Sequence, residues 1–209
     1  MGRITLPDHF SGRWFVLFTH PADFTPICTT EFVGFAKRHE QFREMNCELV
    51  GLSIDQVFAH IKWLEWIEAQ FDVRVEFPVI ADNYGHVVRR LNFVHPERQT
   101  SPLRGLMIVD HESTIRLTMT YPIELGRNLD EVLRAVRGLQ LATREGVALP
   151  ANWPNNEVVG DHVLLPVPRD RTTADSRLRE TSEWECFDWW FCHRPPAGHS
   201  SRGGDEEAR

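Results

Sequence analysis

The 209-residue sequence is poor in cysteine and has no long apolar run. Its four cysteines, at positions 28, 47, 186 and 192, are too few and too unevenly spaced for a small disulfide scaffold. No C-x-x-C pair occurs. No stretch reaches the ~18 consecutive apolar residues of a membrane helix, and the N-terminal residues lack the apolar segment of a secretory signal. We therefore expect a cytoplasmic protein without membrane contact.

Excess positive charge is also absent. The formal net charge of −7 argues against a broad nucleic-acid surface, because phosphate binding needs clustered Lys and Arg. No glycine-rich phosphate loop and no His/Cys cluster with metal-ligand spacing is present, so we expect neither an organic cofactor nor a metal. The contents of 42% apolar and 25% charged residues are ordinary for a folded globular chain.

The first 146 residues alternate between strand and helix patterns. Short apolar runs predict strands at residues 14–18, 48–55, 77–82, 105–110 and 114–121. Apolar positions at steps of three or four, from Phe32 to Met45, predict a helix. Further helices are predicted at 56–70, at 84–91 and, capped by Asn128 or Asp130, up to 145. The inward residues predicted for the helix at 56–70 are Val57, Ile61, Leu64 and Ile67. This order predicts an α/β fold with a central mixed sheet flanked by helices.

The composition changes after Gly146. Residues 147–209 show little apolar periodicity and include the charged run RDRTTADSRLRE. Such a segment cannot easily form a core of its own. We therefore predict a domain at 1–146 and a C-terminal arm at 147–209 that packs on the domain or on another subunit, ending in a disordered polar tail at 200–209.

Cys28 lies in the segment HPADFTPICTTE, between a predicted strand and a predicted helix. Pro26 suits a first helical turn and Thr25 is a candidate N-cap, so Cys28 falls among unpaired backbone N–H groups. This position favours the thiolate, the nucleophile that a peroxide oxidises to a sulfenic acid. Without its flanking residues, a buried structural cysteine is an equally good interpretation.

The flanking residues carry a resemblance. Pro21, Thr25 and Cys28 form P-x-x-x-T-x-x-C, which resembles the active-site loop of the peroxiredoxins. The longer string resembles the one-cysteine-type subfamily, in particular its archaeal and bacterial members. The strings SPLRGLMIVD and YPIELGRNLDEVLR follow in the expected order, and the similarity covers nearly the whole chain. The resemblance implies a thioredoxin-like fold with a C-terminal arm.

The resemblance also implies roles for four residues. Cys28 would be the peroxidatic cysteine and Thr25 the hydroxyl that hydrogen-bonds the incoming peroxide. Pro21 would shape and shield the loop, and Arg104 would stand beside the sulfur. A guanidinium there would stabilise the charge that develops on the leaving oxygen.

Three further residues are candidates for support. Arg127 resembles the second arginine of the subfamily, and Glu31 would orient one of the two guanidiniums through a bidentate pair. The alternative for an isolated arginine is a surface ion pair. His20 directly precedes the loop, where it either lies near the sulfur or is a core histidine.

The late cysteines are candidates for restoring Cys28. The string CFDWWFC resembles the tail of archaeal members, which implies that Cys192 resolves the oxidised cysteine of a neighbouring subunit as a disulfide. Cys186 would exchange with Cys192 or serve as a second resolver. Packing beside tryptophans is the alternative for both. Cys47 is interpreted as a structural cysteine.

The function predicted is a thiol peroxidase that reduces hydrogen peroxide and alkyl hydroperoxides with an external thiol reductant, such as a thioredoxin-type system. The resemblance implies a homodimer and higher ring oligomers. The alternative is a peroxide-responsive redox sensor or chaperone whose oxidation changes its assembly state. A dithiol oxidoreductase is disfavoured, because no cysteine lies two residues from Cys28.

Overall fold

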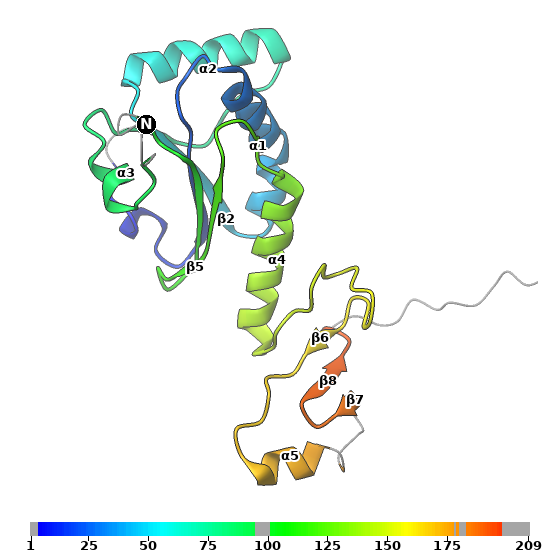
Figure 1. Ribbon diagram of the computed structural model, residues 1–209. Coiled ribbons are helices and arrows are strands. Elements are labelled where there is room, and N and C mark those ends of the chain that lie inside the picture. Colours follow the sequence, from blue (N-terminus) through cyan, green and yellow to red (C-terminus); the bar gives the residue numbers. More distant parts are fainter. Residues whose placement is uncertain (1–3, 95–100, 178, 180–182, 198–209) are drawn as a thin grey trace, which may run out of the picture. The chain divides into compact units, whose positions relative to one another are not determined.

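The computed structural model describes residues 4–94, 101–177, 179 and 183–197. The chain divides into two compact units, Met1–Val136 and Arg137–Arg209, each of which is described by itself (Figure 1). The boundary between them falls within helix α4 (Leu129–Glu145). The polar tail predicted at 200–209 lies outside the described residues.

The first unit contains a five-stranded mixed sheet in the order β3-β2-β1-β4-β5. Its strands are β1 (Trp14–Thr19), β2 (Cys47–Ser53), β3 (Val79–Ala81), β4 (Arg104–Val109) and β5 (Ile115–Tyr121). The first three are mutually parallel, β4 is antiparallel to β1, and β5 is antiparallel to β4. The accompanying helices are η1 (Asp8–Phe10), α1 (Pro26–Glu44), α2 (Val57–Phe71), α3 (His86–Arg90) and the first part of α4. This architecture confirms the predicted thioredoxin-like α/β fold.

Strand β1 lies at the centre of the sheet and is buried along its whole length. Because successive side chains point to opposite faces, it supplies both halves of the core. Phe18 stacks on Phe35 of α1, with ring centroids 4.3 Å apart. Leu17 belongs to the other half, with residues such as Val50 and Val88. The continuous apolar run predicted a strand buried on both faces, and that prediction is confirmed.

Helix α1 carries the predicted apolar stripe, and its first turn carries Cys28. Gly34 allows α4 to approach closely, since a Cβ at this position would lie 2.5 Å from Leu129 Cδ1. Asn128 caps α4, because its Oδ1 accepts hydrogen bonds from the backbone N–H groups of Asp130 and Glu131. This settles the choice between Asn128 and Asp130.

Helix α2 corrects one prediction. Of the residues predicted to face inward, only Ile67 is buried, while Val57 and Ile61 are 57% and 55% exposed. The buried stripe instead comprises His60, Trp63 and Ile67. Trp63 has the largest fully buried side chain and packs on Phe32 at 4.6 Å. Burial of this ring, which removes more apolar area from water than a smaller aliphatic side chain, decides the rotation of the helix.

The second unit has a small sheet that the sequence did not predict. Its strands run in the order β6 (Val163–Leu164), β8 (Phe191–Arg194) and β7 (Glu185–Asp188), and helix α5 spans Arg171–Arg177. The strands are antiparallel and have two to four residues each, too few to show a period of two. Trp189 and Trp190 form the turn between β7 and β8, and this hairpin was not predicted.

Candidate active site

Cys28 is the third residue of α1 and has no exposed surface. The helix begins because Pro26 occupies its first position and Thr25 its N-cap, in an extended conformation. The sequence had suggested that the Thr25 side chain caps the helix. Its hydroxyl makes no such bond and instead donates to the carbonyl of Ala22 at 2.8 Å. The first-turn N–H groups therefore keep their positive field near the Cys28 sulfur.

Arg104, the first residue of β4, lies directly against this sulfur. Its Nη1 donates to Cys28 Sγ at 3.4 Å and to Glu31 Oε2 at 3.0 Å. Its Nε donates to the carbonyl of Ile123 at 3.1 Å, and its side chain is 3% exposed. The guanidinium is therefore fixed by two partners while it contacts the thiol.

Glu31 joins two arginines, where the sequence had predicted one. Its Oε2 accepts from Nη1 of Arg104 and, at 2.7 Å, from Nη1 of Arg127, while its Oε1 accepts from the Arg127 backbone N–H at 2.9 Å. Arg127 Nη2 donates to the carbonyls of Thr19 and Gly105. Burial lowers the pKa of Arg127 and Glu31 opposes that effect, but the ordinary pKa of arginine is so high that the guanidinium stays charged.

Two guanidiniums thus share one carboxylate beside Cys28. The surplus positive charge faces a buried sulfur, where little water screens it. Such an arrangement stabilises a thiolate and any anion that forms on an atom bonded to it. Sequence reasoning named Cys28, Arg104, Glu31 and Arg127, and the fold brings all four together.

His20 and Pro21 lie at the start of the loop that precedes α1, and both are buried. The His20 ring packs against Phe32 at 4.8 Å and Trp63 at 5.3 Å, and burial lowers the pKa of His20. Its Nε2 makes a 2.8 Å hydrogen bond to Asp23 Oδ1. These contacts match the interpretation as a core histidine.

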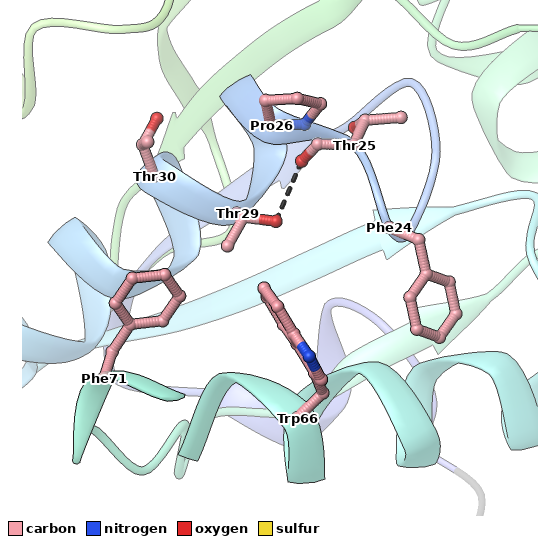
Figure 2. Close-up of a pocket in the computed structure, with 7 residues that line it drawn as sticks. All are labelled: Phe24, Thr25, Pro26, Thr29, Thr30, Trp66 and Phe71. Atoms are coloured by element: carbon pink, nitrogen blue, oxygen red, sulfur yellow. Dashed lines mark hydrogen bonds between the residues drawn. The ribbon is translucent and has the colours of Figure 1, made fainter. Parts of the chain in front are cut away.

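A cavity of about 420 Å³ borders the same loop (Figure 2). It is lined by Phe24, Thr25, Pro26, Thr29, Thr30, Trp66 and Phe71. The Thr29 hydroxyl donates to the Thr25 carbonyl at 2.8 Å and accepts from Trp63 Nε1 at 3.2 Å. The wall of the cavity is therefore apolar on the α2 side, and on the α1 side hydrogen bonds fix the Thr29 side chain that lines it.

One group within the described residues has the composition of a metal site. The side chains of His20, Asp23 and His60 bring three potential ligand atoms within 4.8 Å of one another. His60 Nδ1 lies 2.7 Å from Asp23 Oδ2, and His20 Nε2 lies 2.8 Å from Asp23 Oδ1. Both are ordinary hydrogen-bond distances. Sequence reasoning missed Asp23 and His60.

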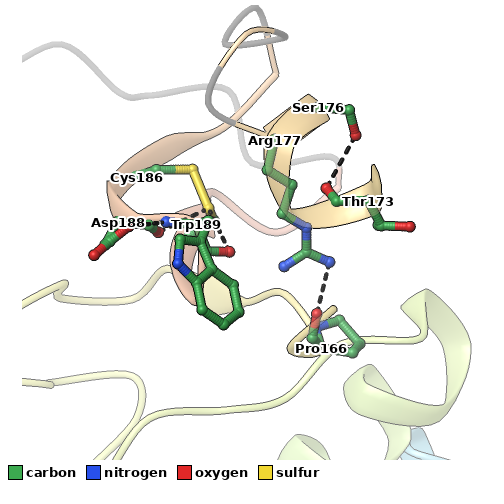
Figure 3. The surroundings of a disulfide bond; sticks show 8 residues. Pro166, Thr173, Ser176, Arg177, Cys186, Asp188 and Trp189 are labelled. Carbon is green, nitrogen blue, oxygen red and sulfur yellow. Dashed lines mark hydrogen bonds between the residues drawn. A yellow bond between two sulfur atoms is a disulfide. The ribbon is translucent and has the colours of Figure 1, made fainter. Parts of the chain in front are cut away.

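The remaining cysteines differ sharply from one another. Cys186 and Cys192 form a disulfide between facing positions of β7 and β8, and Cys192 is buried (Figure 3). Cys47 is a free, buried thiol on β2, and burial raises the pKa of Cys47 well above its ordinary value. Cys47 therefore stays protonated and poorly nucleophilic.

Comparison with known proteins identifies the family. Residues 1–118 match the model of the AhpC/TSA family, and residues 138–181 match that of the C-terminal domain of 1-Cys peroxiredoxin. A peroxiredoxin of Archaeoglobus fulgidus is 56% identical over 195 residues, which cover 92% of this chain and 91% of the relative. The chain belongs to the peroxiredoxin family. It is a thiol-dependent peroxidase.

Other relatives agree with this assignment. A peroxiredoxin of Thermotoga maritima is 55% identical over 193 residues, which cover 92% of this chain and 89% of the relative. The solved structure of a yeast mitochondrial 1-Cys peroxiredoxin has a TM-score of 0.77 and 34% identity, covering 90% of this chain and 88% of its own. Peroxiredoxin 6 of Arenicola marina has a TM-score of 0.80 and 27% identity, covering 95% and 92%. Within the described residues, no helix is both long and apolar enough to cross a bilayer.

Proposed function

We propose that this peroxiredoxin reduces hydrogen peroxide and alkyl hydroperoxides with Cys28 as the attacking sulfur. The proposal rests on the contact of Arg104 Nη1 with Cys28 Sγ at 3.4 Å, within a buried cluster that holds surplus positive charge. A cysteine with only a structural role needs no such cluster.

The Cys28 thiolate attacks the terminal oxygen of the hydroperoxide. An S–O bond forms, the O–O bond breaks, and the leaving oxygen takes a proton to become water or an alcohol, so sulfur is oxidised to a sulfenic acid. Arg104 stabilises the charge on the leaving oxygen, and Arg127 and Glu31 hold Arg104 in place. Thr25 hydrogen-bonds the peroxide, and Pro21 shields the loop.

Restoration of Cys28 is assigned to the arm, residues 147–209. The Cys192 thiol of a neighbouring subunit condenses with the sulfenic acid, which forms a disulfide and releases water. The Cys186 thiolate then attacks Cys192, and Cys28 leaves as a thiolate. This exchange yields the Cys186–Cys192 disulfide, and the presence of that bond in the fold supports the assignment.

An external thiol then reduces Cys186–Cys192. In the yeast mitochondrial 1-Cys peroxiredoxin, thiol resolution proceeds via glutathione and thioredoxin systems, which supports a thioredoxin-type reductant here. We assign residues 1–146 to the peroxidase domain and residues 147–209 to dimerisation. A homodimer, higher rings and a cytoplasmic location complete the proposal.

Peroxide consumption by the full chain with dithiothreitol as the reductant tests the role of Cys28. Cys28→Ser should abolish turnover, and Cys47→Ala, which removes the other free thiol, should retain it. Undiminished turnover in Cys28→Ser would rule out the proposal.

Non-reducing electrophoresis after peroxide treatment tests the resolver. Cys186→Ser should accumulate a covalent dimer, because the Cys28–Cys192 bond forms but cannot be exchanged. Cys192→Ser should give monomer only. A dimer that persists in Cys192→Ser would reassign the resolving role to Cys186.

A second function, a peroxide-responsive sensor or chaperone, is favoured by exposed aromatic side chains in the second unit. Phe187 is 65% exposed and Trp190 is 51% exposed. Peroxide-dependent change in oligomer size, measured by light scattering, together with negligible turnover would favour this function over the first.

A further inference from the structure

Three buried side chains beside the Cys28 loop form a hydrogen-bonded unit that the proposed reaction does not use. The Asp23 carboxylate accepts from His20 Nε2 at 2.8 Å and from His60 Nδ1 at 2.7 Å. Its side chain is 1% exposed, and those of His20 and His60 are 0% and 5% exposed. The unit links the end of β1, the loop before α1, and α2.

The protons in this unit can be placed from its contacts. Burial would raise the pKa of Asp23, but the hydrogen bonds from His20 and His60 outweigh burial and hold the pKa below its ordinary value. Asp23 is therefore a carboxylate, and each imidazole donates one N–H to it. The other ring nitrogens, His20 Nδ1 and His60 Nε2, are buried and have no partner among the described residues. Burying a polar nitrogen without a partner costs free energy. Any stabilisation that the two imidazoles provide therefore comes from their hydrogen bonds to Asp23.

Asp23 is also anchored through its backbone. Its N–H donates to Asp55 Oδ2 at 3.0 Å, and the same oxygen accepts from Ser53 Oγ at 2.8 Å. The next residue, Phe24, has φ of +56°, a left-handed conformation that is strained for a bulky side chain. Thr25 follows immediately. The direction of the Thr25 side chain thus depends on a strained residue that the contacts of Asp23 hold in place.

We propose that Asp23 and His60 are positioning residues for the peroxide reaction, which hold residues 21–25 so that the Thr25 hydroxyl meets a peroxide bound at Cys28. The proposal rests on the proposed role of Cys28. His60 acts from α2, through Asp23, and does not touch the reacting atoms. A displaced Thr25 lowers the rate of peroxide attack, because the hydroxyl no longer aligns the oxygen with the sulfur. The intrinsic reactivity of the thiolate, set by Arg104 and the start of α1, stays unchanged.

Two variants of His60 separate positioning from folding. An asparagine places its amide N–H close to where a histidine has Nδ1–H, whereas a leucine offers no donor. In the reduced full chain, two second-order rate constants are measured for Cys28 by mass spectrometry of quenched samples: oxidation by hydrogen peroxide, and alkylation by iodoacetamide. His39→Leu is the matched control, because it removes a buried imidazole that packs on Phe77 instead.

We expect His60→Leu to slow oxidation by about 10–100-fold while alkylation changes by less than about threefold. His60→Asn should recover most of the oxidation rate, and His39→Leu should match the wild type. An oxidation rate in His60→Leu equal to the wild type overturns the positioning role. A parallel fall of oxidation and alkylation also overturns it, since the variant then damages the thiol site as a whole. Failure of the proposed function looks different, because wild-type Cys28 itself would not react with peroxide.

Discussion

The two units of the chain differ in how their charged side chains and cysteines are packed. In the first, Glu31, Arg104 and Arg127 are buried and joined to one another around a buried thiol. In the second, β7 is largely exposed and Trp190 is half exposed, and a disulfide joins the two strands of the hairpin. The first unit fixes a geometry on all sides of the sulfur, whereas in the hairpin of the second only β8 carries buried side chains and β7 is largely exposed. Fixed geometry suits attack on a small peroxide, and a cysteine pair on a partly exposed hairpin suits exchange with another protein.

The largest difference in stability is expected between substitutions of two carboxylates, one in each unit. Glu31→Gln leaves two buried guanidiniums without their counter-charge and should lower the free energy of unfolding by about 3–5 kcal/mol. Asp175→Asn in the second unit should cost less than about 1 kcal/mol, because Asp175 and its partner Arg171 keep 59% and 93% side-chain exposure. Urea denaturation measures both. Equal losses would contradict the difference drawn between the units.

Loss of the guanidinium fork should come next. Arg104→Lys keeps the charge but cannot contact Cys28 and Glu31 in the same geometry, so oxidation of Cys28 should slow by about 10²–10³-fold. Arg134→Lys, at a partly exposed pair with Glu131, is the control and should leave the rate unchanged. Stopped-flow measurement with hydrogen peroxide decides this. A wild-type rate in Arg104→Lys would remove Arg104 from the reaction.

A smaller contrast is expected between two tryptophans. Trp63→Phe removes buried ring area and the hydrogen bond to Thr29, and should cost about 1–3 kcal/mol. Trp190→Phe should stay within about 0.5 kcal/mol, since its side chain is 51% exposed. Thermal unfolding at one pH compares the two. A large effect at Trp190 would show packing that the exposed surface does not suggest.

The smallest effect is expected from acid. His193 Nδ1 lies 2.8 Å from His162 Nδ1, so the pair shares one proton, and burial followed by the charge of His162 lowers the pKa of His193. The unfolded chain then binds more protons than the folded one. The stabilisation is complete above about pH 6.5 and is lost as the pH falls through the lowered pKa.

The melting temperature should therefore fall between about pH 7 and pH 5, and less so in His193→Asn, which cannot be protonated there. His20 adds a fall of the same sign, because burial lowers its pKa as well. The measurement is the difference between the two pH-dependences. If His193→Asn shows the same slope as the wild type, the histidine pair does not contribute.

Much of the first unit could be predicted because its strands are continuous apolar runs, as β1 illustrates. The face of α2 could not, because a ranking by hydrophobicity ignores both the size of Trp63 and the pairing of His60 with Asp23. That pairing spans 37 positions and forms only once α2 is rotated correctly. The resemblance identified Cys28, Arg104 and Glu31 from the sequence. It did not reveal Asp23 and His60, because their contact depends on this rotation of α2.

The complete burial of Cys28 sets a race between two later events. A sulfenic acid with no exposed surface cannot be reached by a thiol from another chain until the first turn of α1 opens. A second peroxide is far smaller than a protein thiol and needs a smaller opening, and it would convert the sulfenic acid to a sulfinic acid that thiols do not reduce. Under the proposed cycle, the survival of this enzyme at high peroxide is therefore governed by the opening rate of one helical turn.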